Sequence, residues 1–258
     1  MPIKAGIYYF ANNPDEHNLP PVILIHGAGG SHLSWPPEIR RMPGQRVLTV
    51  DLPGHGKSSG LGKGSIHEYV KSIKDLMDDL SLYKAIIVGH SMGGAIALEL
   101  ALDHPERVIG LGLIATNARL RVSQAILDGL AHKSTITRAI QTIVDWSCGP
   151  LANETLRKLS VRQLEETRPA VLRGDLVACN NFDAVQRMPE INKPTLIVCG
   201  TEDRMTPVRF SEFLAMQIPG AALQTIDMAG HMVMLEQPRR LAAILNVFIM
   251  SIHYIPGV

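Results

Sequence analysis

The sequence predicts an α/β protein, with a mostly parallel sheet, helices on both faces of it and an inserted all-helical segment. Short apolar runs rich in Val and Ile recur along the chain, and such runs suit strands that are covered on both faces. Helical patterns lie between these runs, and strands that alternate with helices favour parallel pairing. A long stretch with helical patterns but no convincing strand predicts the insertion.

The apolar runs predict six strands, each ending near Gly, His or Asp. The sixth is the weakest, because polar residues interrupt it. The predicted strands lie within Pro20–Gly27, Arg46–Gly54, Lys84–Ser91, Val108–Ala115, Pro194–Asp203 and Ala222–His231.

Three amphipathic or apolar patterns predict helices that cover the sheet. Within Ser65–Leu82 the apolar residues fall on one stripe at helical spacing. A second helix is predicted from Met92 to His104, because Pro105 ends the pattern there. An amphipathic pattern that begins at Arg239 predicts a helix near the end of the sequence.

We expect residues 117–189 to form a helical cap, inserted into a core made of residues 1–116 and 190–258. Ordinary crossover helices are the alternative, but one crossover rarely needs four helices. The four predicted stripes are Ala125, Ile126 and Leu130; Ile136, Ala139, Ile140, Ile143 and Val144; Leu156, Leu159 and Leu164; and Val171, Leu172, Leu176 and Val177.

Composition excludes several functional classes. The chain has 258 residues, of which 46% are hydrophobic, so it can bury a large core. Its net charge of +1, without clustered Lys and Arg, gives no electrostatic reason to bind nucleic acid or an anionic membrane. The first residues lack the long apolar region of a secretory signal. No apolar run reaches about 18 residues, the length that a membrane span needs. We therefore expect a cytoplasmic protein, either a monomer or a homodimer.

The cysteines predict neither a disulfide framework nor a metal site. Cys148, Cys179 and Cys199 lie far apart and form no C-x-x-C pair, and their number is odd. No cluster of Cys, His and Asp suggests a metal ion, and no organic cofactor is expected. Buried or half-buried thiols are the favoured interpretation.

The pentapeptide Gly89-His90-Ser91-Met92-Gly93 fits the G-x-S-x-G pattern of a nucleophile elbow. A nucleophile at the end of a strand needs a sharp turn into the next helix, and glycines remove the clashes that such a turn creates. The start of a helix also favours negative charge beside Ser91. The pattern also occurs by chance, with a Ser that only caps a helix. Here the predicted strand before it and helix after it favour the elbow.

A serine nucleophile needs a base, and the base needs a carboxylate that orients it. His231 is the candidate base, because it follows a strand-like segment in a loop and precedes the last helix. Asp203 is the candidate acid, because it follows the fifth predicted strand, where ligand-facing residues of a parallel sheet gather. Three other carboxylates rank lower. The side chain of Glu202 should point elsewhere, Asp51 precedes Ser91 in the chain, and Asp227 is too near His231 in the chain.

Acyl transfer also needs two N–H groups that stabilise an oxyanion. The backbone N–H of Met92 is one candidate. The glycine-rich loop "HGAGGSHLSW" after the first long strand supplies the other, for which we choose the N–H of Ala28. A phosphate-binding loop is the competing interpretation, but the segment lacks both of the glycine patterns typical of such loops.

Five motifs, in this order, resemble the α/β-hydrolase superfamily: "HGAGG", "DLPGHGKS", "GHSMGG", "PTLIVCGTEDRMTP" and "AGHMVMLEQP". The resemblance implies an eight-stranded, mostly parallel sheet with a helical cap inserted after the sixth strand. By position, Ser91, Asp203 and His231 match the nucleophile, acid and base of that family. Ala28 and Met92 match its oxyanion donors, and the small side chain of Ala28 is expected to leave room beside the nucleophile.

Within that superfamily the chain looks like the small, capped carboxylesterases. Serine at position 91 argues against haloalkane dehalogenases and epoxide hydrolases, which use Asp there. The expected activity is cleavage of small to medium apolar esters through an acyl-enzyme, with substrate contacts from Trp35, Trp146 and Met232 unless these are core residues. Three alternatives stay open: a carbon–carbon bond hydrolase of the meta-cleavage type, a lactonase or perhydrolase, and a ligand receptor that keeps the triad but turns over slowly.

Overall fold

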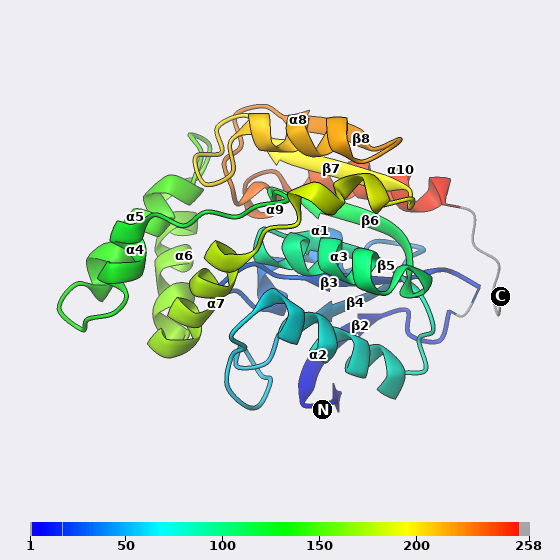
Figure 1. The fold of residues 1–258 in the computed structure, drawn as a ribbon, viewed down its shortest axis with the longest axis horizontal. Coiled ribbons are helices and arrows are strands. Elements are labelled where there is room, and N and C mark those ends of the chain that lie inside the picture. Colours follow the sequence, from blue (N-terminus) through cyan, green and yellow to red (C-terminus); the bar gives the residue numbers. More distant parts are fainter. Residues whose placement is uncertain (1, 17, 253–258) are drawn as a thin grey trace.

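The computed structural model describes residues 2–16 and 18–252, and it contains one eight-stranded sheet with helices on both faces (Figure 1). The strands lie in the order β1-β2-β4-β3-β5-β6-β7-β8. β3 to β8 pair in parallel, whereas β1 and β2 pair antiparallel. The predicted fold class is therefore confirmed. The bounds are β1 Ile3–Lys4, β2 Ile7–Asn12, β3 Pro21–Ile25, β4 Arg46–Val50, β5 Ala85–His90, β6 Val108–Ile114, β7 Thr195–Gly200 and β8 Ala222–Ile226.

All six predicted strands are present, as β3 to β8, and two strands at the start of the chain were not predicted. β8 lies at one edge of the sheet and alternates between exposed and less exposed residues, which explains its weak apolar pattern. β1 and β2 lie at the other edge, where a short or half-exposed strand needs no continuous apolar run.

The two faces of the sheet carry separate apolar cores. In β3, Ile23 and Ile25 face a core formed with α2 and α3, while Val22 and Leu24 face a core formed with α1 and α10. This alternation is the two-residue period of a strand that is buried on both sides. The three predicted covering helices are confirmed as α2, α3 and α10. The bounds are α1 Pro37–Arg40, α2 Ile66–Asp79, α3 Met92–Asp103, α8 Val208–Gln217, α9 Val233–Glu236 and α10 Pro238–Ser251.

Between β6 and β7 the chain leaves the sheet and forms helices that lie at one end of the molecule, beside the sheet (Figure 1). We call residues 117–189 the cap segment. Each of the four predicted stripes forms a helix, and a short 3-10 helix follows. A bridge between Arg119 and Asp183 joins the two ends of the segment, and their side chains form an ion pair of 2.6 Å. The helices are α4 Gln124–Gly129, α5 Ile136–Ser147, α6 Glu154–Glu166, α7 Pro169–Asn181 and η3 Val185–Glu190.

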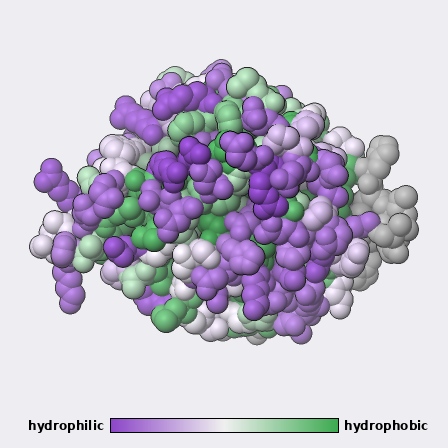
Figure 2. Space-filling model, in the orientation of Figure 1, coloured by the Kyte–Doolittle hydropathy of each residue, from purple (hydrophilic) through white to green (hydrophobic). Residues whose placement is uncertain are grey.

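The face of the molecule shown in Figure 2 is mostly hydrophilic, and apolar residues occur in small groups among the hydrophilic ones. In the ranges that the structure describes, no helix combines the length and the apolar character needed to cross a membrane.

All three cysteines are buried and form no disulfide bond, as predicted.

Candidate active site

Ser91 stands on a strained turn between β5 and α3. Its backbone has φ +52° and ψ −115°, a conformation that residues with a side chain rarely adopt. Glycines make the turn possible. A Cβ at Gly89 would overlap the backbone of Gly93, and a Cβ at Gly93 would overlap Ile25 O and lie 2.7 Å from His26 O. The sequence pattern G-x-S-x-G is therefore a steric requirement of this turn.

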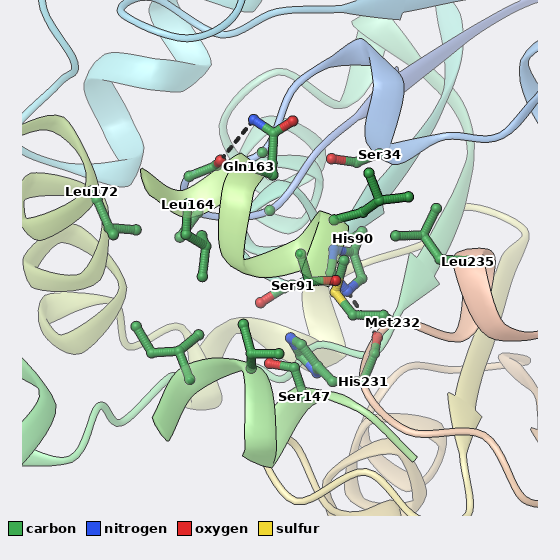
Figure 3. A pocket seen from close by; sticks show the side chains of 18 of the residues that line it. Ser34, His90, Ser91, Ser147, Gln163, Leu164, Leu172, His231, Met232 and Leu235 are labelled. Atoms are coloured by element: carbon green, nitrogen blue, oxygen red, sulfur yellow. Dashed lines mark hydrogen bonds between the residues drawn. The ribbon is translucent and has the colours of Figure 1, made fainter. Parts of the chain in front are cut away.

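His231 and Asp203 form a buried pair beside this turn. His231 Nδ1 donates to Asp203 Oδ2 at 2.9 Å, which leaves the other ring nitrogen, Nε2, free to act as a base. Both residues are almost fully buried. Ser91 and His231 line the same cavity (Figure 3), and His231 follows β8 as Asp203 follows β7. The structure thus pairs His231 with Asp203 and places His231 and Ser91 on the wall of one cavity.

Thr206 also contacts this pair, although no sequence motif points to it. Its hydroxyl donates to Asp203 Oδ2 at 2.7 Å and lies 3.2 Å from His231 Nδ1. The backbone N–H groups of Met205 and Thr206 donate to Asp203 Oδ1, each at 2.8 Å. Burial by itself would raise the pKa of Asp203, but His231 and these hydrogen bonds outweigh it, so the pKa lies below its ordinary value. Asp203 therefore stays ionised near neutral pH.

His90 packs against the candidate base without adding charge. The two rings lie with centroids 4.8 Å apart, and His90 Nε2 donates to the carbonyl oxygen of His231 at 3.0 Å. Burial, together with the charge of His231, lowers the pKa of His90 to about 3. His90 is therefore neutral and supports the loop that carries His231.

The glycine-rich loop after β3 presents Ala28 to the cavity that Ser91 lines. The Gly27 carbonyl accepts from His26 Nδ1 at 2.7 Å and from Gly30 N–H at 3.1 Å. Because a trans peptide holds its C=O and N–H on opposite sides, these bonds also fix the direction of the Ala28 N–H. Within residues 2–16 and 18–252, the N–H groups of Ala28 and Met92 donate no hydrogen bond to the protein.

His26 keeps one proton, on Nδ1, because its Nε2 accepts from the N–H of Leu52 at 3.0 Å. Burial and the nearby charge of His55 lower the pKa of His26 to about 4. A neutral ring is the form that can both donate to Gly27 and accept from Leu52.

The cavity beside Ser91 has a volume of about 450 Å³ and is mostly apolar. Residues of α5, α6 and α7 form one side of it, so the cap segment lines the space next to the candidate nucleophile (Figure 3). Its apolar lining consists of Ala28, Leu33, Ile143, Val144, Leu156, Leu159, Leu164, Leu172, Leu176, Met205, Met232 and Leu235.

Of the three predicted substrate contacts, only Met232 lines this cavity. The prediction is wrong for Trp35, which is fully buried in the core beneath α1 and α10. It is also wrong for Trp146, which is 38% exposed at the end of α5 and does not line the cavity. The sequence indicated that both were large and apolar, but not which way each one points.

The competing carboxylates lie elsewhere. Asp51 is buried and accepts from His32 and from the Lys57 N–H, so it orders the turn after β4. Glu202 and Asp227 are exposed.

One group of possible metal ligands at the surface has no sequence pattern, because its members come from two helices. Ligand atoms of His67, Glu99 and Asp103 lie within 4.8 Å of one another on α2 and α3. Asp103 already pairs with Arg187 at 2.8 Å, and none of these residues lines the cavity.

Known proteins resemble the chain over most of its length. The 3-oxoadipate enol-lactonase 1 of Acinetobacter baylyi is 27% identical over 93% of this chain and 92% of its own. A pimeloyl-[acyl-carrier protein] methyl ester esterase of Neisseria meningitidis serogroup C is 29% identical over 88% of this chain and 93% of its own.

Solved structures also match the fold over most of the chain. A thermophilic esterase superposes with a TM-score of 0.83 at 29% identity, over 95% of this chain and 94% of that one. The enol-lactonase of Burkholderia xenovorans LB400 superposes with a TM-score of 0.86 at 22% identity, over 95% and 96% of the two chains. A family model described as the alpha/beta hydrolase fold matches residues 20–238. The chain belongs to the alpha/beta hydrolase fold family.

Proposed function

We propose that the chain is a serine hydrolase that cleaves carboxylic esters of small to medium apolar substrates through an acyl-enzyme. The observation that supports this most directly is the buried hydrogen bond between His231 Nδ1 and Asp203 Oδ2, beside a strained Ser91 that lines the same cavity as His231. A hydroxyl, a base with a free nitrogen and an ionised carboxylate are the parts that a serine nucleophile requires.

In the proposed reaction, His231 Nε2 takes the proton of the Ser91 hydroxyl while the Ser91 oxygen attacks the ester carbonyl. The N–H groups of Ala28 and Met92 stabilise the oxyanion that forms. The imidazolium then gives its proton to the leaving alcohol, and a water molecule repeats the sequence on the acyl-enzyme. Asp203 stabilises the imidazolium and stays ionised throughout, in keeping with its lowered pKa.

The lining of the cavity supports a mostly apolar substrate, since the two charged residues in it, Arg162 and Glu166, pair with each other at 2.7 Å. A volume of about 450 Å³ is in the ordinary range for a small-molecule site, and mostly apolar walls favour acyl chains or aromatic groups. The relatives named as a methyl ester esterase and as a thermophilic esterase are in keeping with ester cleavage.

A lactone is the second candidate substrate, because the relative from Acinetobacter baylyi is named as an enol-lactonase and is similar over 93% of this chain. A lactone is a cyclic ester, so the same residues would open it. The difference lies in the leaving group, which stays attached to the acyl part after the ring opens.

The test is hydrolysis of p-nitrophenyl acetate, butyrate and octanoate by the wild type and by Ser91→Ala, with a series of lactones assayed beside them. Ser91→Ala should retain only background activity. Ser72→Ala is the matched control, because the Ser72 hydroxyl is exposed and bonds only a carbonyl of its own helix, so activity should stay unchanged. A fluorophosphonate should label the wild type on Ser91. Full activity in Ser91→Ala, or no turnover of any ester or lactone by the wild type, would contradict the proposal.

A further inference from the structure

Both polar backbone groups of Gly29, the residue after Ala28, are bound by the cap segment. The Gly29 N–H donates to Asp175 Oδ2 at 2.9 Å. Its carbonyl accepts from Thr167 Oγ1 at 2.9 Å and from Gln163 Nε2 at 3.4 Å. The loop that presents Ala28 to the cavity is therefore held, one residue further on, by side chains from more than 130 positions away, since the separations are 146, 138 and 134 residues.

The loop and the cap segment also pack closely against each other at Gly29. Gly29 has φ +64°, and a Cβ there would lie 2.8 Å from side-chain carbons of Leu164 and of Leu172. The left-handed backbone favours glycine, and any larger residue would force these leucine side chains to shift. The contact is therefore specific packing as well as hydrogen bonding.

The carboxylate of Asp175 is fully buried, and three donors converge on it. Besides Gly29, they are His55 Nε2 at 2.7 Å and the hydroxyl of Tyr69 at 2.5 Å. An ionised carboxylate can only accept, so it satisfies all three, whereas an amide would keep one accepting oxygen and place an NH2 group where the other oxygen lies.

His55 donates from both ring nitrogens, because its Nδ1 lies 3.1 Å from the Pro53 carbonyl oxygen and its Nε2 bonds the Asp175 carboxylate. Burial by itself would lower the pKa of His55, but the hydrogen bond and charge of Asp175 outweigh it, and the pKa lies above its ordinary value. The carboxylate of Asp175 is thus fixed from the core side by His55 and Tyr69, and it holds Gly29 on the other side.

We propose that Asp175 is a positioning residue for oxyanion stabilisation: from the cap segment it fixes the Ala28–Gly29 peptide, and so helps to hold the Ala28 N–H, which lies in the preceding peptide, toward the oxyanion. The proposal rests on the function proposed above, in which Ala28 is an oxyanion donor. The peptide planes on both sides of Ala28 are then fixed, one by His26 and Gly30 through the Gly27 carbonyl, the other by Asp175.

The competing explanation is that Asp175 only anchors the cap segment. The two roles differ in what they change. Loss of an anchor alters the walls of the cavity, which changes KM or stability. A misdirected Ala28 N–H weakens binding of the oxyanion. Because the oxyanion exists only near the transition state, this lowers kcat.

The experiment compares four variants with the wild type, using the ester that the wild type hydrolyses best. Asp175→Ala removes the acceptor of the Gly29 N–H, while Asp175→Asn keeps one carbonyl oxygen there. Thr167→Val removes the bond to the Gly29 carbonyl with little change in shape, and it serves if Asp175→Ala does not fold. Asp183→Asn is the matched control in the same segment, because Asp183 pairs with Arg119 and does not contact the loop.

Removal of one oxyanion donor costs about 10²–10³-fold in kcat, so a donor that is kept but misdirected should cost about 10–100-fold. We expect a fall of that size in Asp175→Ala, a smaller one in Thr167→Val, partial recovery in Asp175→Asn and no change in Asp183→Asn, with KM within about threefold throughout. A folded Asp175→Ala with wild-type kcat, or one that changes KM alone, would overturn the proposal.

Hydrogen exchange separates a failure of this proposal from a failure of the proposed function. Backbone amides of the loop from Gly27 to Ser31 should exchange faster in Asp175→Ala than in Asp183→Asn, whether or not any ester is cleaved. If the wild type cleaves no ester but exchange is faster in Asp175→Ala, the proposed function fails, while the role of Asp175 in holding the loop is supported. If esters are cleaved and exchange is unchanged, the positioning role fails alone.

Discussion

The neutrality of His90 inside the folded protein leads to a measurable dependence of stability on pH. Its ring is buried, and burial followed by the charge of His231 lowers its pKa from 6.5 to about 3. In the unfolded chain the ring has its ordinary pKa of about 6.5. Below that pH the unfolded chain binds a proton that the folded protein does not bind, so acid favours unfolding through this one residue.

The size of the effect follows from linkage. From about pH 7.5 to about pH 5, a histidine that titrates only in the unfolded chain reduces the free energy of unfolding by about 2 kcal/mol. The loss begins as the pH falls through the unfolded pKa and continues down to the folded pKa. The result depends little on the folded value, because about 3 lies well below the pH range of the experiment.

The assay is urea unfolding of the wild type and of His90→Gln at both pH values. Glutamine keeps an N–H donor for the His231 carbonyl but does not titrate in this range. Other groups, including His55 with its opposite shift, titrate in both proteins and cancel in the comparison. The wild type should lose about 2 kcal/mol more than His90→Gln between the two pH values. Equal losses in both proteins would refute the assignment of a buried neutral ring to His90.

Two further predictions concern the candidate site and the glycines of the fold. Thr206→Val removes a hydrogen bond of 2.7 Å to the Asp203 carboxylate, and bonds to charged groups are worth about 1.5–3 kcal/mol, so kcat/KM in ester hydrolysis should fall about tenfold or more. An unchanged kcat/KM would show that Thr206 does not support Asp203. Gly93→Ala forces a Cβ into the backbone of β3 and should reduce the free energy of unfolding by about 3 kcal/mol or more, measured by urea unfolding. Gly174→Ala is its counterpart in the interior of α7, where the nearest atom to an added Cβ is 3.8 Å away, so it should raise the free energy of unfolding by about 0.5–1 kcal/mol. Equal effects of the two glycine substitutions would contradict the steric argument.

Features that depend on consecutive residues were predictable from the sequence. The turn at Ser91 requires glycines at fixed neighbouring positions, and the five residues of the pattern contain them. Asp203 and His231 could be chosen because each follows a predicted strand, and the ends of parallel strands meet at one edge of the sheet. The four helices of the cap segment followed from apolar stripes at helical spacing.

Features that depend on distant contacts were not predictable. Asp175 meets His55 and Tyr69 across separations of 120 and 106 residues, and no local pattern marks such a meeting. Nothing in the sequence distinguishes Thr206 from the other threonines, and only the folded loop brings its hydroxyl to Asp203. The same limit explains Trp35, because an aromatic residue before a short helix packs equally well into a core or a cavity wall until the neighbouring elements are in place.

The joined ends of the cap segment, at Arg119 and Asp183, have a consequence for engineering and for divergence within the family. A segment that leaves and re-enters at one point looks exchangeable for the corresponding segment of a relative. However, the Ser147 carbonyl in this segment accepts from the N–H of His231 at 2.8 Å, so it supports the candidate base directly. Under the proposed function, a chimera that exchanges residues 117–189 as a block would change the walls of the cavity and the support of His231 together, so the exchange would have to keep this backbone contact.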